Sequence, residues 1–343
     1  MKQISIISTL LGCTLCTLVA TAEESYIAPL ANESLLLDLT KTTADLVTVG
    51  ERGHILRSQN GEQWVQEKAP TLSTLTAITS TEGKSWAVGH DAIIIQQDSK
   101  GQPWVIQNFL PELQKPLLDV HFINAKEGIA IGAYGTYFET SDGGENWVRV
   151  AHSQFLPVED IEYLEEIRLE DEAFYLSELT SILPHLNKIT QVGEMLYIAG
   201  ESGLIARSDD KGKSWQRMDV PYYGSFFDIT ALEDGSVVAV GLRGNIFKLD
   251  NAGSNWVTVN SGITSSLNTI VPLEGNSFVA MGNSGNVICV KNNEVRKAHF
   301  DDGKAINALL LDENQLFIAT ATGIKTLAYD KKHTVCEGMS KTL

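Results

Sequence analysis

The arginines of the chain are the side chains best suited to bind an anionic substrate. There are eight of them: Arg52, Arg57, Arg149, Arg168, Arg207, Arg217, Arg243 and Arg296. Arginines that converge on a substrate carboxylate, with a tyrosine and acidic residues beside them, would suit the hydrolysis of an anionic glycoside. None of the eight stands in a sequence context typical of such a site. We therefore expect no enzymatic activity, with a glycoside hydrolase or a carbohydrate-binding protein as the alternative.

Other motifs that support catalysis or cofactor binding are missing from the sequence. It contains no Gly-x-Ser-x-Gly and no His-Glu-x-x-His motif. Its Gly-x-x-Gly segments join two strands, so they lack the helix N-terminus that a phosphate would use. The histidines show no spacing typical of metal ligands. We expect neither a metal nor a cofactor.

The dominant feature of the chain is an internal repeat, first seen as "VGERGHILRSQNGEQW", which ends at Trp64. Similar segments end at Trp147, Trp215 and Trp256, and a weaker copy that ends at Trp104 has Ala92 in place of the second glycine. The first glycines of the units stand at positions 50, 89, 132, 200, 241 and 282. A period of about 40 residues is typical of a four-stranded propeller blade. The repeat predicts an all-β, seven-bladed β-propeller, with six or eight blades as alternatives.

Each unit can be divided into four short strands. In the second unit we expect them at residues 75–79, 86–88, 92–97 and 104–107, since these segments are rich in β-branched and aromatic residues and are bounded by turn formers. The Gly-x-x-Gly segment is then the turn between strands two and three, where glycine can adopt a positive φ. The tryptophan begins the outer strand and packs between blades. Residues 25–37 are expected to supply the missing outer strand of the last unit.

The two ends of the chain are expected to lie outside the propeller, which spans residues 23–330. Residues 1–22 have the pattern of a secretory signal peptide cleaved after Ala22, which predicts export to the periplasm. A lipoprotein anchored through Cys13 is a second interpretation. Residues 331–343 are expected to form a tail. Export permits a disulfide between Cys289 and Cys336, but the sequence leaves that pairing open.

The charge of the chain is strongly negative. Its formal net charge is −17, and loss of Lys2 with the leader makes this about −18. Nucleic acids and anionic bilayers bind basic surfaces, which a chain with this charge is not expected to have. We expect a soluble monomer that does not bind nucleic acid.

Two segments carry a resemblance to a known family. "SDDKGKSW", which ends at Trp215, and "TSDGGENW", which ends at Trp147, match the Asp-box of BNR repeats, whereas units one and five have Gln59 and Asn251 in place of the aspartate. With the glycine pattern, residues 36–330 resemble the photosystem II stability/assembly factor family of β-propellers. The resemblance implies a non-catalytic helper that assembles a membrane complex, or in exported bacterial relatives an accessory to an envelope system such as an RND-type exporter. Asp boxes also occur in sialidases, which keeps the hydrolase alternative open.

Variable residues of the turns offer one candidate surface. The turns between strands two and three emerge on one face of a propeller. The residues before the second glycine are Arg52, Tyr134, Ser202, Arg243, Ser284 and Thr322. Arg57 and Arg207 lie four residues beyond that glycine in their units. The turn residues and these two arginines form either a surface for recognition of a partner or an ordinary solvated surface.

An insertion between units three and four, residues 151–184, offers a second surface. It carries nine acidic residues and one arginine, and its apolar residues recur at helical spacing. We expect one or two amphipathic helices that dock a basic partner, form a lid over the central channel, or merely cap blades three and four. Tyr222 and Tyr223 are expected near the same face. The candidate partner-binding residues are Arg52, Arg57, Tyr134, Glu162, Glu165, Glu166, Arg207, Tyr222, Tyr223 and Arg243, and the expected partner is a membrane protein complex or one of its subunits.

Overall fold

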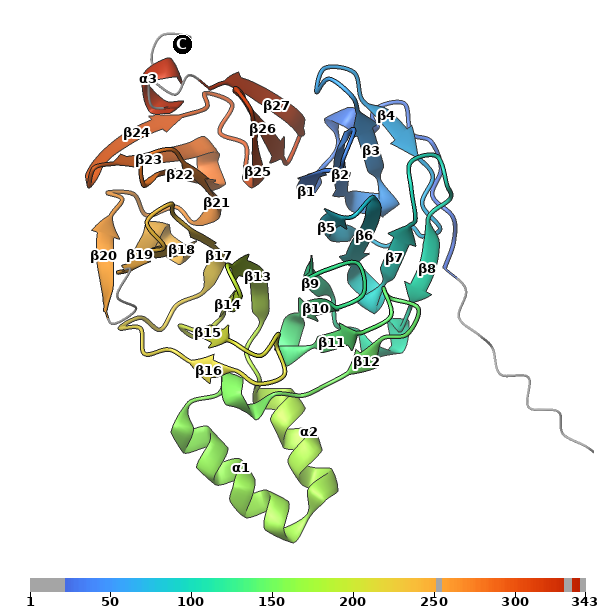
Figure 1. Ribbon diagram of the computed structural model, residues 1–343, viewed down its shortest axis with the longest axis vertical. Coiled ribbons are helices and arrows are strands. Elements are labelled where there is room, and N and C mark those ends of the chain that lie inside the picture. Colours follow the sequence, from blue (N-terminus) through green and yellow to red (C-terminus); the bar gives the residue numbers. More distant parts are fainter. Residues whose placement is uncertain (1–21, 251–254, 330–334, 340–343) are drawn as a thin grey trace, which may run out of the picture.

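A computed structural model shows seven antiparallel sheets arranged in a ring, which is the architecture of a seven-bladed β-propeller (Figure 1). The residues that the structure describes are 22–250, 255–329 and 335–339. Asn251 and nearly all of the predicted leader lie outside these ranges. Six sheets have four strands, and the seventh has three within the described residues. The repeat therefore predicted both the class of fold and the number of blades.

Each blade is a meander whose strands follow one another from the axis to the rim. Blades one to three contain β1 (Leu36–Lys41), β2 (Leu46–Gly50), β3 (Ile55–Ser58), β4 (Val65–Glu67), β5 (Leu75–Thr81), β6 (Lys84–Gly89), β7 (Ile94–Gln97), β8 (Val105–Asn108), β9 (Leu117–Phe122), β10 (Gly128–Gly132), β11 (Tyr137–Thr140) and β12 (Val148–Arg149). Blades four and five contain β13 (Leu186–Val192), β14 (Met195–Gly200), β15 (Ile205–Ser208), β16 (Gln216–Arg217), β17 (Phe226–Ala231), β18 (Val237–Gly241), β19 (Asn245–Leu249) and β20 (Trp256–Asn260). Blades six and seven contain β21 (Leu267–Leu273), β22 (Ser277–Gly282), β23 (Asn286–Lys291), β24 (Glu294–His299), β25 (Ile306–Asp312), β26 (Gln315–Thr320) and β27 (Gly323–Ala328).

The N-terminal segment does not complete blade seven with a strand, so that prediction was wrong. Ser25 instead pairs with Ala69 after the outer strand of blade one, with its N–H 2.8 Å from the carbonyl oxygen. The chain then forms the short 3-10 helix η1 (Ala31–Glu33), which packs on β27. The ring closes through side-by-side packing of β1 and β25, which is the same packing that the inner strands of other neighbouring blades show.

The Gly-x-x-Gly segments form the turns between the second and third strands, as predicted, but the two glycines have different roles. In blade one, Arg52 and Gly53 both have a positive φ, 54° and 68°. Gly50 is extended, and it must be glycine because a Cβ there would lie 2.1 Å from the carbonyl oxygen of Leu35. Blade two keeps this turn with Ala92 at a φ of 48°, a conformation that alanine adopts at some cost.

Apolar layers fill the space between neighbouring blades, and the repeated tryptophans belong to them. They are Trp64, Trp104, Trp147, Trp215 and Trp256, each of which stands at or just before the start of an outer strand. Phe226 at the start of β17 is fully buried in the layer between blades four and five. The predicted position of the tryptophans between blades is confirmed.

The Asp boxes are self-contained turns between the third and fourth strands. In blade four, Ser208 Oγ donates a hydrogen bond of 2.8 Å to Asp210, which also accepts from the N–H and Oγ of Ser214 at 2.9 and 2.6 Å. In blade one the residue in the aspartate's place is Asn60, which accepts from two backbone N–H groups at 3.0 and 3.1 Å. The assignment of Gln59 to that place was wrong, because the loop of blade one is one residue shorter.

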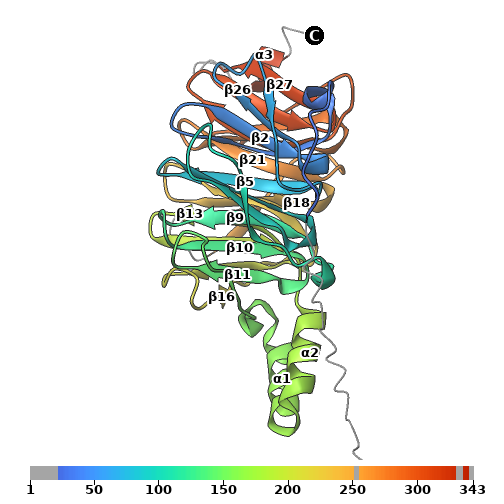
Figure 2. The same ribbon diagram turned by 90° about the vertical axis from the view of Figure 1, so that its right-hand side faces the viewer.

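The insertion forms two antiparallel helices, α1 (Val158–Glu170) and α2 (Glu172–Ile182). Asp171 separates them, and its side chain caps α2 by accepting from two backbone N–H groups. Leu164, Tyr175 and Leu179 are buried against the apolar layer between blades three and four. Both helices project from the outer edge of the disc, away from the central channel (Figures 1 and 2), so the lid hypothesis was wrong. Among the described residues, no helix is both long and apolar enough to cross a lipid bilayer.

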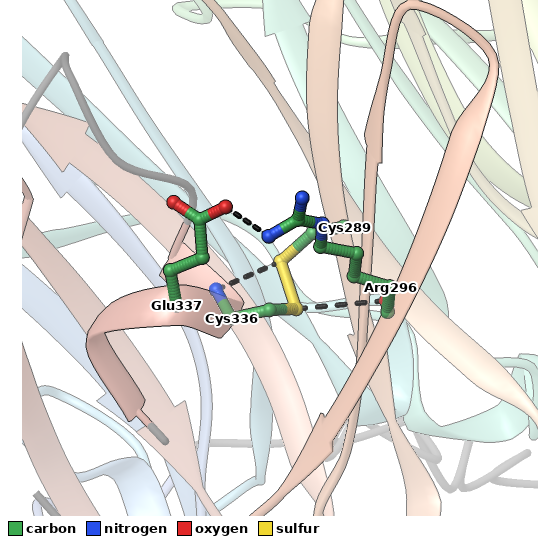
Figure 3. The surroundings of a disulfide bond; sticks show 4 residues. All are labelled: Cys289, Arg296, Cys336 and Glu337. Carbon is green, nitrogen blue, oxygen red and sulfur yellow. Dashed lines mark hydrogen bonds and ion pairs between the residues drawn. A yellow bond between two sulfur atoms is a disulfide. The ribbon is translucent and has the colours of Figure 1, made fainter. Parts of the chain in front are cut away.

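The short helix α3 (Val335–Met339) is fixed to blade six by a disulfide between Cys289 on β23 and Cys336 (Figure 3). The N–H of Cys336 also lies 3.1 Å from Cys289 Sγ, and Arg296 pairs with Glu337 beside the bridge. Val335 and Cys336 are both buried in the apolar layer between blades six and seven. The predicted tail 331–343 therefore includes a docked helix, and its other residues lie outside the described ranges.

Replacing Cys336 with serine is expected to lower the free energy of unfolding by about 2–4 kcal/mol, because the bridge joins residues 47 apart in the sequence and restricts the unfolded chain. Urea unfolding with and without a reductant measures the effect. The reductant should lower the stability of the wild type to that of Cys336→Ser and leave the variant unchanged. A wild type whose stability does not respond to complete reduction would contradict this prediction.

Candidate partner-binding site

Three of the predicted site residues lie on one face of the disc, in equivalent turns. Arg52, Tyr134 and Arg243 each occupy the left-handed position of their turn and are exposed to solvent. Tyr134 is held from two sides, since its ring lies 4.5 Å from the ring of His185 and 5.3 Å from Lys115 Nζ. We call these three residues the rim. The face that carries them is the one that the sequence predicted.

Arg57 does not belong to the rim, and its prediction as a partner-binding residue is not supported by its position. It lies at the far end of β3, and its side chain is only 8 % exposed. Its guanidinium pairs with Glu67 at 2.5 Å and with Asp45 at 3.4 Å, and it donates to Gln97 of blade two at 2.7 Å. Because all these partners are within the protein, Arg57 ties blade one to blade two.

Arg207 occupies the equivalent position in blade four, and it too lies away from the rim. Its guanidinium donates only within its own blade, to Gln216 at 3.0 and 3.1 Å, and the pair is exposed. The sequence placed these two arginines together because their positions in the repeat are equivalent. Their surroundings differ because Arg57 has two carboxylate partners in its own blade, Asp45 and Glu67, and a third partner, Gln97, in the neighbouring blade.

The acidic residues of the insertion are available to a partner. Glu162, Glu165 and Glu166 lie on α1 and are exposed, and Arg168 pairs with Glu165 at 3.3 Å. Since the helices extend beyond the outer edge of the disc, this acidic surface lies beside the propeller and not over its channel (Figure 1).

A groove of about 600 Å³ separates the start of α1 from the outer strand of blade four, β16. Tyr222 and Tyr223 both line it. Tyr222 is half-buried and donates from its hydroxyl group to the carbonyl oxygen of Leu242 at 3.2 Å, whereas Tyr223 is 94 % exposed. The structure thus brings the two tyrosines and the insertion together at one site, as the sequence predicted for their shared face.

Sequence reasoning missed the charged residues at the axis. A central channel of about 290 Å³ is bordered by the inner strands of all seven blades, and its lining includes Asp38, Asp119, Lys188 and Asp228. Lys188 Nζ pairs with Asp119 at 3.2 Å. The described lining contains no arginine and no tyrosine, so the cluster that would favour hydrolysis of a carboxylated sugar is not found at this place.

The three axial aspartates belong to a ring of hydrogen bonds that joins each blade to the next. In blades one, three and five, an aspartate accepts from a backbone N–H of the following blade, at 2.8–2.9 Å. In the other four blades, a threonine or asparagine donates to a carbonyl oxygen of the following blade, at 2.7–2.9 Å. The side chains are Asp38, Thr76, Asp119, Asn187, Asp228, Asn268 and Asn307.

A pattern in the sequence could have revealed this ring. The inner strands of blades one, three and five begin "LLD", "LLD" and "FFD", and those of the other blades begin with an apolar residue followed by threonine or asparagine. The alternation is clear only when the inner strands are aligned. The glycines and tryptophans that define the repeat follow the inner strand in each unit, so they do not reveal the alternation.

Burial destabilises the charged form of two carboxylates at the axis, those of Asp38 and Asp228. Burial raises the pKa of Asp38 to about 6, with Lys188 acting against this rise and Asp119 adding to it. Burial also raises the pKa of Asp228. Burial would lower the pKa of Lys188, but Asp119 and the other two carboxylates outweigh it, so the pKa of this lysine is raised and it stays charged at neutral pH.

The raised pKa of Asp38 predicts a pH dependence with a defined sign. The folded protein binds a proton at a pH of about 6, and the unfolded chain binds it only near 3.8. As the pH falls from about 7.5 to about 4, this residue should therefore raise the free energy of unfolding, by about 3 kcal/mol at most. Asp38→Asn should remove that gain, and urea unfolding across this range measures the difference. Parallel curves for the wild type and Asp38→Asn would contradict the prediction.

A sequence profile described as photosynthesis system II assembly factor YCF48 matches residues 106–305, more than half of the chain. The chain belongs to this family. No curated protein sequence matches it.

Several solved structures share the fold of this chain. A structure described as YCF48 bound to D1 peptide superposes with a TM-score of 0.65 at 14 % identity, covering 91 % of this chain and 100 % of that one. YCF48 from Cyanidioschyzon merolae gives 0.65 at 12 % identity, covering 90 % and 99 %. The WD40 β-propeller domain of Doa1 gives 0.63 at 12 % identity, covering 91 % and 97 %. At such low identity these likenesses concern the fold, since many functions are found on propellers.

Proposed function

We propose that this protein is an exported, non-catalytic accessory factor that binds a segment of a membrane protein and helps to assemble or maintain its complex. Membership in the YCF48 family carries the proposal, together with the fold that the chain shares with a YCF48 described as bound to D1 peptide. The partner of this chain is then a subunit of a membrane complex. An RND-type exporter or another envelope complex is the class that we favour.

The rim and the acidic face of α1 are the surfaces that we assign to partner binding. The rim presents two arginines and a tyrosine, which are residue types enriched among the strongest contacts of protein interfaces. The acidic face presents Glu162, Glu165 and Glu166 to a basic surface of the partner. Charge of this kind increases the rate of association and selects among partners more than it adds affinity.

We propose the periplasm as the location, on the basis of the signal-peptide pattern of residues 1–22. The test is fractionation of cells that express the full chain, with sequencing of the mature N-terminus. A mature chain that begins at Glu23 in the periplasmic fraction supports the proposal. A chain that keeps Met1, or one acylated at Cys13, would overturn it.

Partner binding can be tested by cross-linking in intact cells followed by purification and identification of the attached membrane subunits. Deletion of residues 153–183 is a poor variant, because it would uncover the apolar layer against which Leu164 and Leu179 pack. Charge reversal on the surface avoids this problem. Arg52→Glu with Arg243→Glu should reduce cross-linking at least tenfold, about 1.4 kcal/mol. The matched control is Glu194→Lys, in the exposed turn between β13 and β14.

The control should cross-link as well as the wild type. If the same membrane subunits are recovered equally with the reversed rim and with a triple reversal of Glu162, Glu165 and Glu166 to lysine, the assigned surfaces are wrong. If no membrane subunit is recovered with the wild type, the proposed function itself fails.

A further inference from the structure

The groove between α1 and blade four has the features of a preformed binding site. Gly203 N–H donates to the carbonyl oxygen of Gly224 at 2.7 Å, which fixes the loop that carries the two tyrosines. On the other side, the N–H of Trp215 donates to Gln154 Oε1 at 3.2 Å, which holds the start of the insertion against the blade. Because both walls are held by such bonds, an occupant would not have to order them first.

The lining of the groove is largely apolar and aromatic. It includes Leu156, Pro157, Val158, Ile161, Trp215, Met218, Val220, Tyr222 and Tyr223. Tyr223 is 94 % exposed and Val158 is 66 % exposed. Tyrosines that are exposed beside an apolar concavity provide contact area at a small cost in conformational entropy, so they act well as anchors for a partner.

One side of the groove is the edge of a sheet. The two-residue strand β16 is the outermost strand of blade four, and within the described residues it pairs with β15 and with no further strand (Figure 1). Gln216 and Arg217 of this strand and the following Asp219 line the groove. An exposed strand edge can bind an extended segment through main-chain hydrogen bonds. Pockets that accept every second side chain of that segment then make the binding specific.

The charge around the groove favours a basic occupant. Glu159 and Asp219 line it, and the adjacent surface of α1 adds Asp160 and Glu162. The one cation of the described lining, Arg217, donates to the carbonyl oxygens of residues 155 and 202 at 2.6 and 2.9 Å and keeps its positive charge. The four carboxylates outnumber it, so the local charge that an approaching chain meets is negative.

We propose that this groove binds an extended segment of the partner protein in which lysine or arginine alternates with apolar residues. The apolar side chains enter the groove between Trp215 and Tyr223, and the basic ones meet the carboxylates of Glu159 and Asp219. This inference rests on the proposed function and gives it a site and a class of ligand. A partner subunit would be recognised through a short basic stretch outside its folded core.

The test uses a fluorescent peptide of about eight residues, within the usual length of a strand, in which lysine and valine alternate. Its matched partner has glutamate in place of lysine. Fluorescence anisotropy with the full chain should show saturable binding of the lysine peptide and none of the glutamate peptide. Glu159→Lys and Tyr223→Ala should each weaken binding at least tenfold, about 1.4 kcal/mol. Both side chains are exposed, so neither change threatens the fold. Glu194→Lys, with the same change of charge elsewhere on blade four, should bind within about twofold of the wild type.

Three results would overturn the inference. Equal weakening by Glu159→Lys and Glu194→Lys would show attraction to the whole acidic surface, and wild-type binding by Tyr223→Ala would show that the groove is not used. A concentration-dependent dimer that Tyr223→Ala abolishes would show that a second copy occupies the groove. The proposed function has a separate readout, since cross-linking to a membrane subunit that survives Glu159→Lys and Tyr223→Ala would retain the function and reject this site.

Discussion

Arg57→Ala is expected to lower the free energy of unfolding by about 3 kcal/mol, the lower end for a broken buried ion pair, because Glu67 loses its charged partner and buried Asp45 keeps only Lys100. Asp45 is 1 % exposed at its side chain and Glu67 is 22 % exposed, and both pair with this one guanidinium. Lys100 also reaches Asp45, at 2.8 Å, but its own side chain is 47 % exposed. Urea or thermal unfolding measures the loss. Since the network joins blades one and two, the variant should also become more sensitive to proteolysis in these two blades.

The matched control is Arg207→Ala, which removes the equivalent side chain of blade four. That guanidinium bonds only to Gln216 on the surface, so the change should stay within about 0.5 kcal/mol. Arg57→Lys should recover only part of the loss, because an ammonium group cannot bond to Glu67 and Gln97 with the geometry of a guanidinium. Equal effects of the two alanine variants would mean that burial of Arg57 has no energetic consequence, and this prediction would be wrong.

Lys188→Met is expected to lower the free energy of unfolding at neutral pH by a similar amount, about 3–5 kcal/mol. The axis then keeps three carboxylates and loses the cation that pairs with Asp119. Lys188 holds down the raised pKa values of Asp38 and Asp228, so without the lysine these two pKa values in the folded protein should rise further above those of the unfolded chain. Groups whose folded pKa is raised gain stability as the pH falls, so the deficit of the variant should shrink from about pH 7.5 to about pH 4.5.

This prediction has an internal control at the same site. Adding Asp38→Asn to Lys188→Met removes one carboxylate from the axis, and it should restore part of the lost stability at neutral pH. In the wild-type background the same change removes a group that Lys188 stabilises, so the two substitutions should not be additive. Additive effects together with a deficit that is independent of pH would show that Lys188 acts through packing and not through charge.

The sequence predicted the fold well because the features that define a blade are local. Glycines with a positive φ and the Asp boxes act within one unit. The tryptophans pack against the preceding blade from the same place in each unit, so all three features recur at a fixed spacing. The helices of the insertion were also predictable, since their apolar residues follow the helical period. The way in which the ring closes between blades seven and one was not predictable. Whether residues 25–35 form a strand depends on contacts with blade one, which a local pattern does not contain.

The candidate site was predictable only in part, for the same reason. Arg52, Tyr134 and Arg243 share a face because their positions in the repeat are equivalent. The same logic failed for Arg57, whose burial depends on Gln97 of the next blade. The groove beside β16 was hidden because it combines the start of α1 with a strand and a loop almost 60 residues away in the sequence. Only their spatial arrangement shows that Tyr223 and Val158 face one cavity.

The hydrogen bonds at the axis have a consequence for the ancestry of such rings. Each bond joins a side chain of one blade to the backbone of the next, so it places no demand on the neighbour's sequence. A duplicated or exchanged blade would carry its own side chain for the bond to the next blade, so it could join the ring without a further substitution. Charge sets a limit, however: every added copy of an aspartate-bearing blade increases the repulsion that Lys188 alone offsets. Growth by gene duplication would therefore favour the asparagine type of blade.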